Sequence, residues 1–277
     1  MRRTTHPERW PRPTVVGIVN VTPDSFSDGG TYASPEDAAE AAGRMLAEGA
    51  AIVDVGGEST RPGADPVGVD EELGRVLPVL ERLKGRRLSI DTSRAEVARQ
   101  ALALGVELVN DITALRRDPE LAGVVADSGA SLCLMHMQGE PRTMQEAPRY
   151  DDVVSDVSAF LEARLSYAVE AGIDEERICL DPGFGFGKTP EQNLVLLRRI
   201  DELVALGRPV MVGISRKWTL ARVVLGPDAR VGTDAASVGA AVAAFDRGAT
   251  LFRVHDVRSH VEALAVAAAV ERGTVER

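Results

Sequence analysis

The chain has 277 residues, of which 44% are hydrophobic, and it carries a formal net charge of −10 with a pI near 5.0. This length and hydrophobic content favour a single domain with a large core, because barrels of about 250 residues commonly fold as one unit. The negative charge argues against a nucleic-acid or anionic-membrane surface, since either partner requires a basic face.

Neither an export signal nor a membrane span is indicated. The longest apolar stretch, residues 263–270, is far shorter than the roughly 18 residues that a spanning helix needs. Residues 1–13 are charged and interrupted by proline, so we interpret them as an N-terminal extension and 14–277 as the domain. Cys133 and Cys179 each fall in a predicted buried strand, which indicates packing rather than a disulfide or a zinc site. These features predict a cytoplasmic protein.

Eight apolar runs stop abruptly at polar or glycine-rich residues, as is typical of buried parallel strands that deliver functional groups to one edge of a sheet. These predicted strands are 15–19, 52–55, 88–90, 107–109, 132–135, 178–180, 210–212 and 251–254. Segments with helical spacing and helix-start signals follow them at 36–48, 71–83, 96–104, 118–127, 151–171, 190–206, 233–246 and 258–270. The strand and helix patterns alternate along the whole chain.

This alternation predicts an α/β fold of the (β/α)₈ TIM-barrel type, in which the loops after the strand carboxyl ends build the reactive face. A doubly wound open sheet is the competing interpretation, because a sequence pattern does not report closure. The first strand is not followed by G-x-G-x-x-G, which argues against that alternative.

Two carboxylates and an amide stand at the ends of different predicted strands. They are Asp91, Asn110 and Asp181. Any one of them alone is equally well explained as a helix cap or a turn former. In a closed barrel all three would point into one cavity, where they suit a flat heterocycle with an amino-amide edge.

Cationic and neutral donors follow other strands. Arg61, Lys217, Arg253 and His255 would form the cluster that an acidic chain needs to hold a phosphate ester or a carboxylate. Solvated surface arginine is the commoner explanation for an isolated case. Asn20 ends the first strand and could supply one oxygen ligand to a Mg²⁺ ion that also binds phosphate.

Three loops suggest further roles. The glycine-rich and hydroxyl-rich loops 22–30 and 56–63 suit a mobile cover over a reaction site, although such loops are often simply turns. The run DPGFGFGKT would place Phe184 or Phe186 beside the cavity, where a ring can stack on an aromatic substrate. A phosphate-binding loop ending in Lys188 is the alternative, but three residues rather than four separate the glycines Gly183 and Gly187.

In order and spacing, seven motifs closely resemble dihydropteroate synthases. They are NVTPDSFSDGG, DVGGESTRPGA, SIDT, VND, DPGFGFGKT, GISRK and RVHDV. The resemblance implies a (β/α)₈ barrel of folate biosynthesis that joins 6-hydroxymethyl-7,8-dihydropterin diphosphate to p-aminobenzoate. It further implies release of diphosphate by dissociative C–O cleavage, Mg²⁺ as the cofactor, and a homodimer.

The resemblance also implies residue roles by motif position. The pterin and catalytic set would be Asp91, Asn110, Asp181 and Lys217, with Met135 and Gly213 completing the pterin site. The diphosphate would be held by Asn20, Ser59, Arg61, Arg253 and His255, with Asn20 as the metal ligand. The p-aminobenzoate site would comprise Thr60, Arg61, Pro62, Phe186, Lys217 and Trp218, and a lid would comprise Thr22, Asp24, Phe26, Ser27 and Asp28.

One position departs from the family pattern. The family usually has serine or arginine where this chain has Trp218, so we expect altered acceptor affinity with retained pterin chemistry. A backbone N–H at the helix start could replace the missing anion partner. Two alternative functions share the pterin site: a methyltetrahydrofolate-corrinoid methyltransferase-like barrel, and a catalytically altered pterin-binding paralogue. The first would need a corrinoid partner, and the second would be expected to lack the diphosphate-binding residues.

Overall fold

The computed structural model describes residues 10–22, 34–59, 64–140 and 142–275. Its strands are β1 (Thr14–Asn20), β2 (Ile52–Gly56), β3 (Leu88–Asp91), β4 (Leu108–Asp111), β5 (Ser131–Met135), β6 (Ile178–Asp181), β7 (Met211–Val212) and β8 (Leu251–Val254). Its helices are α2 (Pro35–Ala47), α3 (Val69–Arg82), α4 (Ala95–Ala103), α5 (Leu121–Ser128), α6 (Val153–Glu170), α7 (Pro190–Arg198), α8 (Ile200–Val204), α9 (Trp218–Leu225), α10 (Asp234–Phe245) and α11 (Val257–Arg272), with a 3₁₀ turn η1 (Glu175–Arg177).

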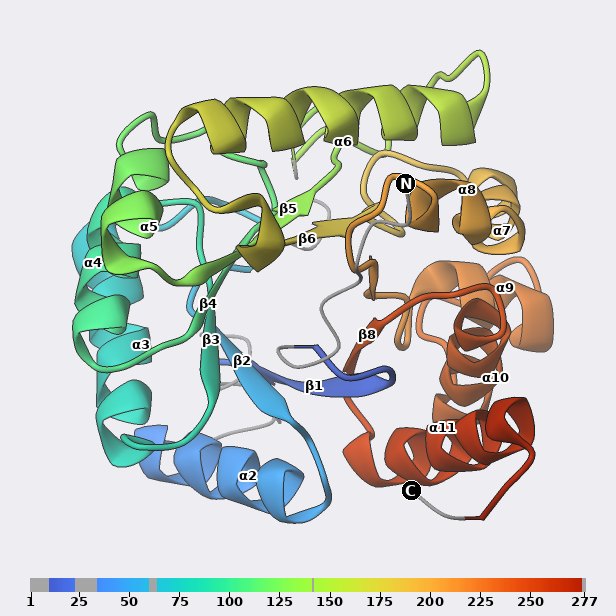
Figure 1. Ribbon diagram of the computed structural model, residues 1–277, viewed down its shortest axis with the longest axis horizontal. Coiled ribbons are helices and arrows are strands. Elements are labelled where there is room, and N and C mark those ends of the chain that lie inside the picture. Colours follow the sequence, from blue (N-terminus) through green and yellow to red (C-terminus); the bar gives the residue numbers. More distant parts are fainter. Residues whose placement is uncertain (1–9, 23–33, 60–63, 141, 276–277) are drawn as a thin grey trace.

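The eight strands form one parallel sheet with the order β6-β5-β4-β3-β2-β1-β8-β7. A parallel bridge between Leu180 and Val210 joins the two edges, and the Leu180 N–H donates to the Pro209 carbonyl at 2.9 Å. The helices surround the strands as an outer ring (Figure 1). The predicted barrel is therefore confirmed, and the open doubly wound alternative is wrong.

Apart from shifts of a few residues at helix ends, the helices differ from the predicted ones in two respects. The segment predicted as one helix over 190–206 is broken at Arg199 into α7 and α8. The Arg199 guanidinium donates to Asp152 at 2.8 Å and to Glu202 at 2.6 Å. The residue pattern does not predict these contacts. The short helix α9 is additional to the predicted series, and no side-chain hydrogen bond caps its start.

Several helix starts follow directly from the sequence. Ser34 accepts a hydrogen bond from the Asp37 N–H with Pro35 in the first turn, and Thr233 caps α10 in the same way. Thr189 and Gln192 form a reciprocal capping box at the start of α7. Each cap satisfies backbone N–H groups that have no partner within the helix, and so fixes where the loop from the reactive face ends.

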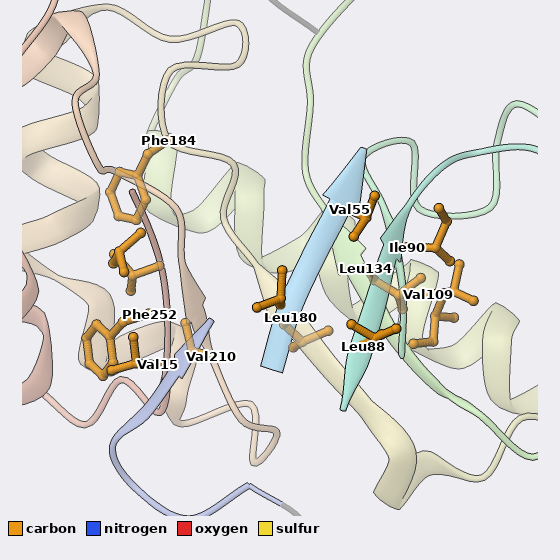
Figure 2. Packing of buried hydrophobic residues seen from close by; sticks show 14 of the residues in the cluster. Val15, Val55, Leu88, Ile90, Val109, Leu134, Leu180, Phe184, Val210 and Phe252 are labelled. Atoms are coloured by element: carbon orange, nitrogen blue, oxygen red, sulfur yellow. The ribbon is translucent and has the colours of Figure 1, made fainter. Parts of the chain in front are cut away.

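Apolar packing on both sides of the strands holds the barrel together. The larger cluster lies between the strands and the ring of helices; Figure 2 shows part of it, with Val15 and Phe252 side by side. The smaller fills the barrel interior at the amino ends of the strands, where Trp10 packs on a layer formed by Val16, Ile52, Leu108, Cys133, Cys179, Met211 and Leu251. Both cysteines are buried free thiols in this layer, in agreement with the predicted packing role.

Residues 10–13, which precede β1, also pack against the barrel. Trp10 is 3% exposed, and the Arg12 guanidinium lies 3.9 Å from the centre of the Phe245 ring while its Nε donates to the Ala249 carbonyl. The segment before β1 thus closes the end of the barrel opposite the reactive loops. Within the described ranges, the helices lack any stretch long and apolar enough to cross a membrane.

Candidate active site

A cavity of about 1060 Å³ opens at the carboxyl ends of the strands. Its wall includes residues from the ends of β1, β3, β4, β6 and β8 and from the loops that follow β6 and β7. Small-molecule sites commonly enclose roughly 300–1,000 Å³. The cavity therefore has room for a bicyclic heterocycle beside a second aromatic ring.

The floor of this cavity is set by strand register. Asn20, Gly56, Asp91 and Asn110 are successive partners across β1, β2, β3 and β4. A Cβ atom at Gly56 would lie 3.3 Å from Asp91 Cβ and 3.6 Å from Asn20 Oδ1. The glycine thus leaves space in which the polar side chains of the neighbouring strands come together.

Arg253 connects two carboxylates in the barrel interior. Its Nε donates to Asp54 Oδ2 at 2.6 Å and its second terminal nitrogen donates to Asp91 Oδ2 at 2.9 Å. Asn110 Nδ2 also donates to Asp54 Oδ2, at 2.9 Å. Burial by itself lowers the pKa of Arg253, but Asp54 and Asp91 outweigh it and hold the pKa above its ordinary value. Burial raises the pKa of Asp91 to about 7, against the opposing effect of Arg253.

Asp181 and Lys217 line the opposite side. Burial raises the pKa of Asp181, while the Gly183 N–H, which donates to its Oδ1 at 2.7 Å, and the Lys217 ammonium lower it. Burial likewise lowers the pKa of Lys217 to about 7, against the effect of Asp181. Lys217 Nζ donates to the Phe184 carbonyl at 2.5 Å and lies 4.1 Å from the centre of the Phe186 ring. This wall therefore brings together the Asp181 carboxyl group, the Lys217 amine and the Phe186 ring.

Ser215 and His255 form a neutral pair at the ends of β7 and β8. The Ser215 hydroxyl accepts the His255 backbone N–H at 3.2 Å and lies 3.0 Å from His255 Nδ1. Burial, with Arg216 and Arg253, lowers the pKa of His255 to about 3, so its ring is neutral near pH 7. A neutral imidazole carries one ring N–H, so His255 can act as a hydrogen-bond donor without being a cation.

Comparisons with known proteins agree with this geometry. Residues 16–255 match the family model for pterin-binding enzymes. The dihydropteroate synthase of Escherichia coli (strain K12) is 47% identical over 258 residues, which cover 92% of this chain and 90% of that protein. The chain belongs to the pterin-binding enzyme family. The dihydropteroate synthase of Mycobacterium leprae (strain TN) is also 47% identical, over 262 residues that cover 92% of each chain.

Solved structures of the pterin-binding enzyme family share the fold. The dihydropteroate synthase of Xanthomonas albilineans with 4-aminobenzoic acid is 49% identical and superposes with a TM-score of 0.86 over 94% of both chains. The Burkholderia cenocepacia dihydropteroate synthase complexed with 7,8-dihydropteroate is 47% identical, with a TM-score of 0.83 over 95% of this chain and 93% of that one.

Most of the predicted site residues of this pterin-binding enzyme meet at the cavity. Those that line it are Asn20, Asp91, Asn110, Met135, Asp181, Phe186, Gly213, Lys217, Trp218, Arg253 and His255. Thr22 is buried and Ser59 half-buried, and neither is among the lining residues. Thr60, Arg61 and Pro62, and the lid residues Asp24, Phe26, Ser27 and Asp28, lie outside the described residues.

Asp54 supports the site through bonds to two of its lining residues, although no role was predicted for it. It is 1% exposed, it binds Arg253 and Asn110, and its Oδ1 has no hydrogen-bond partner. The available signal was a carboxylate inside the apolar run of β2, where an unpaired charge is costly. Such a residue requires a cationic partner from another strand of the barrel, and here Arg253 of β8 provides it.

The phosphate-binding-loop alternative for Gly183–Lys188 is wrong. Lys188 is fully buried, and its ammonium group is bonded to His136 and to carbonyls of its own loop rather than directed toward the cavity. The glycines serve a different purpose. Gly183, Gly185 and Gly187 have φ values of +66°, +77° and +61°, a left-handed conformation that strains other residues.

The metal prediction rests on Asn20 alone. Among the residues that the structure describes, no group of three or more His, Cys, Asp or Glu side chains is arranged to hold a metal ion. Asp91, which lies level with Asn20 two strands away, is already bonded to Arg253. This donor set suits a Mg²⁺ ion that keeps its waters and is brought by phosphate oxygens, since Mg²⁺ commonly takes few protein ligands.

Proposed function

We propose that this chain is a dihydropteroate synthase, which joins 6-hydroxymethyl-7,8-dihydropterin diphosphate to p-aminobenzoate and releases diphosphate. The observation that carries the proposal is the convergence of Asp91, Asn110, Asp181 and Lys217 on one cavity. Family membership supports it, because the relatives named above are dihydropteroate synthases that match this chain over most of its length.

The pterin would bind between the carboxylates of Asp91 and Asp181. Its amino and ring N–H groups are donors, and burial has left both carboxyl groups with raised pKa values. Donors that approach these oxygens favour the ionised form, so binding lowers both pKa values again. Asn110 Nδ2 donates to Asp54, so the side-chain oxygen of Asn110 is oriented as a third acceptor for the pterin.

The diphosphate would bind near Arg253, His255 and Asn20. Arg253 keeps its charge in the pocket, while His255 is neutral and can donate a hydrogen bond. At the same end, the Asn20 side-chain oxygen would help to hold a Mg²⁺ ion. A bound Mg²⁺ would stabilise the negative charge of the leaving group.

In the reaction, the bond between the pterin methylene carbon and the diphosphate oxygen breaks, and the electron pair leaves with diphosphate. The pterin ring spreads the positive charge that develops on the methylene carbon. The Asp181 carboxylate attracts this charge more strongly as it grows, which lowers the barrier. The neutral arylamine nitrogen then attacks the methylene carbon and releases its proton to solvent, so no dedicated strong base is needed.

The acceptor would lie against Phe186, the Lys217 stem and Trp218. Trp218 stands at the first position of α9, and the Arg222 guanidinium stacks 4.6 Å from the centre of its ring. The indole provides an aromatic wall but no anion partner, so the acceptor carboxylate would depend on backbone N–H groups at the helix start. We expect Trp218→Ser to change the KM for p-aminobenzoate; an unchanged KM would contradict this role.

The direct test is to incubate purified protein with the pterin diphosphate, p-aminobenzoate and Mg²⁺, and to measure 7,8-dihydropteroate and diphosphate. Both products should form in equal amounts, and EDTA should suppress them. Failure of the folded protein to form product would contradict the proposal, whereas full activity in EDTA would contradict only the Mg²⁺ assignment. Methyl transfer from methyltetrahydrofolate to a corrinoid would favour the alternative enzyme.

We also propose a cytoplasmic homodimer. The two buried free thiols suit a reducing compartment, and the family resemblance implies the dimer. Light scattering after size-exclusion chromatography should give twice the 29.5 kDa of one chain. A single-chain mass at micromolar concentration would contradict the dimer.

A further inference from the structure

Lysine is rare in this chain. Of its 32 basic residues only three are lysines, Lys84, Lys188 and Lys217, and the remainder are arginines. Lys84 is exposed, whereas Lys188 and Lys217 both bond the loop Gly183–Gly187. A lysine ammonium is compact and offers three donors, while a guanidinium is a large planar fork. The two lysines that bond this loop therefore stand at positions where a compact ammonium group fits and a guanidinium does not.

Lys188 makes three hydrogen bonds with its terminal nitrogen. Nζ lies 2.9 Å from His136 Nδ1 and donates to the carbonyls of Gly183 and Phe186, each at 3.0 Å. The side chain is 0% exposed. Burial lowers its pKa well below the ordinary value and lowers the pKa of His136 to about 2. The three bonds survive in either form, because an ammonium donates three times and an amine donates twice and accepts from a ring N–H.

The other carbonyls of the loop face different partners. The three left-handed glycines turn successive peptide groups in different directions, so the Phe184 carbonyl accepts from Lys217 Nζ while those of Gly185 and Gly187 accept from Gln145 and Tyr150. The side chain of Phe186 lies against Lys217 at the cavity wall. The loop is thus held from its buried side by Lys188 and presents Lys217 and Phe186 on its cavity side.

We propose that Lys188 is a positioning residue: by bonding the Gly183 and Phe186 carbonyls from the buried side of the loop, it sets the Phe186 ring and the Lys217 stem at the acceptor end of the cavity. This inference rests on the proposed function for the identity of the acceptor, p-aminobenzoate. Without the anchor, two buried carbonyls lose their partner and the left-handed loop loses the contact that holds it. A displaced ring and lysine stem would make weaker contacts with the acceptor, and each roughly 1.4 kcal/mol lost from binding weakens affinity about tenfold.

The test compares Lys188→Met with the matched surface variant Lys84→Met. We expect Lys188→Met to fold, to show one cooperative unfolding transition, and to raise the KM for p-aminobenzoate about tenfold or more, with a much smaller change in kcat. Hydrogen exchange should be faster in a peptide covering 182–189 and unchanged in peptides from β1 and α11. Lys188→Gln, which retains two N–H donors, should recover part of both the loop protection and the KM. Lys84→Met should match the wild type.

Three outcomes would overturn the inference. They are wild-type KM and exchange in Lys188→Met, a uniform increase of exchange with kcat and KM changing together, and a Lys188→Gln variant no better than Lys188→Met. If the wild type forms no dihydropteroate, the proposed function fails, but the exchange experiment still decides whether Lys188 holds the loop. The two failures are therefore distinguishable.

Discussion

Asp181 is a buried carboxyl group whose charge depends on its neighbours. Its oxygen accepts the Gly183 N–H at 2.7 Å, and burial raises its pKa while Lys217 and Arg253 lower it. We expect Asp181→Asn to reduce kcat by about tenfold or more, because each 1.36 kcal/mol lost from transition-state stabilisation costs a factor of ten. Steady-state kinetics measure this effect, with the exposed Asp246→Asn as control. Wild-type turnover in Asp181→Asn would remove Asp181 from the mechanism.

Lys217 should be the most reactive lysine of the protein. Burial lowers its pKa to about 7, with Asp181 opposing. Amines react with acylating reagents only as the neutral base, so the labelling rate of Lys217 should rise through pH 7 and reach its plateau below pH 9. Peptide mass spectrometry at pH 8 should find Lys217 labelled before Lys84 and Lys188 unlabelled, with protection by bound pterin. Faster labelling of Lys84 would contradict this account of the pocket.

At the residue scale, the sequence predicted most of the polar side chains of the site but not the hydrogen bonds and ion pairs between them. Asp91, Asn110 and Asp181 were predictable because each residue ends an apolar run. In a parallel sheet the carboxyl ends of the strands lie at the same edge, so the three side chains are expected there. Asp54 was not predictable, because it lies inside such a run and its partner Arg253 is 199 residues away. The burial of Lys188 was equally hidden, since its bond to His136 spans 52 residues.

The loop between β6 and α7 is the element on which the acceptor wall depends. A Cβ atom at Gly183 would lie 1.9 Å from the His136 carbonyl oxygen, and the residue has a φ of +66°. Gly183→Ala should therefore destabilise the protein by more than about 2 kcal/mol, or prevent folding. Urea denaturation measures the change. The matched control is Gly123→Ala in α5, where the added methyl meets nothing within 4 Å and should stabilise by up to about 1 kcal/mol. Equal stabilities of the two variants would contradict this assignment.

At the element scale, all eight strands were predictable because buried parallel strands are continuous apolar runs with abrupt polar ends. The helices were predictable where caps are explicit, as at Ser34, Thr189 and Thr233. The break at Arg199 was not, because no glycine or proline marks it, and Arg199 is bonded to Asp152, the residue that caps α6. Loop conformation at Gly183–Gly187 likewise depends on contacts made only in the folded barrel.

At the scale of the whole molecule, the barrel has a polar reactive end and an apolar closed end. Trp10 closes the latter and is 3% exposed. Trp10→Ala should lower the free energy of unfolding by about 3–5 kcal/mol, the usual cost of removing a large buried aromatic side chain. The KM values for both substrates should stay unchanged, because the cavity lies at the opposite end. Denaturation and kinetics of the same preparation test both statements, and a raised KM in a fully folded variant would contradict the separation of the two ends.

Closure of the barrel brings the two sides of the site together. Asp181 at the end of β6 becomes a neighbour of the ends of β7 and β8 only when β6 and β7 join through the bridge between Leu180 and Val210. The most direct test of this account is a crystal structure with the pterin substrate bound. We predict that the heterocycle lies between Asp91, Asn110 and Asp181, with Lys217 beside it. A pterin bound elsewhere, with these four side chains out of contact with it, would contradict the account.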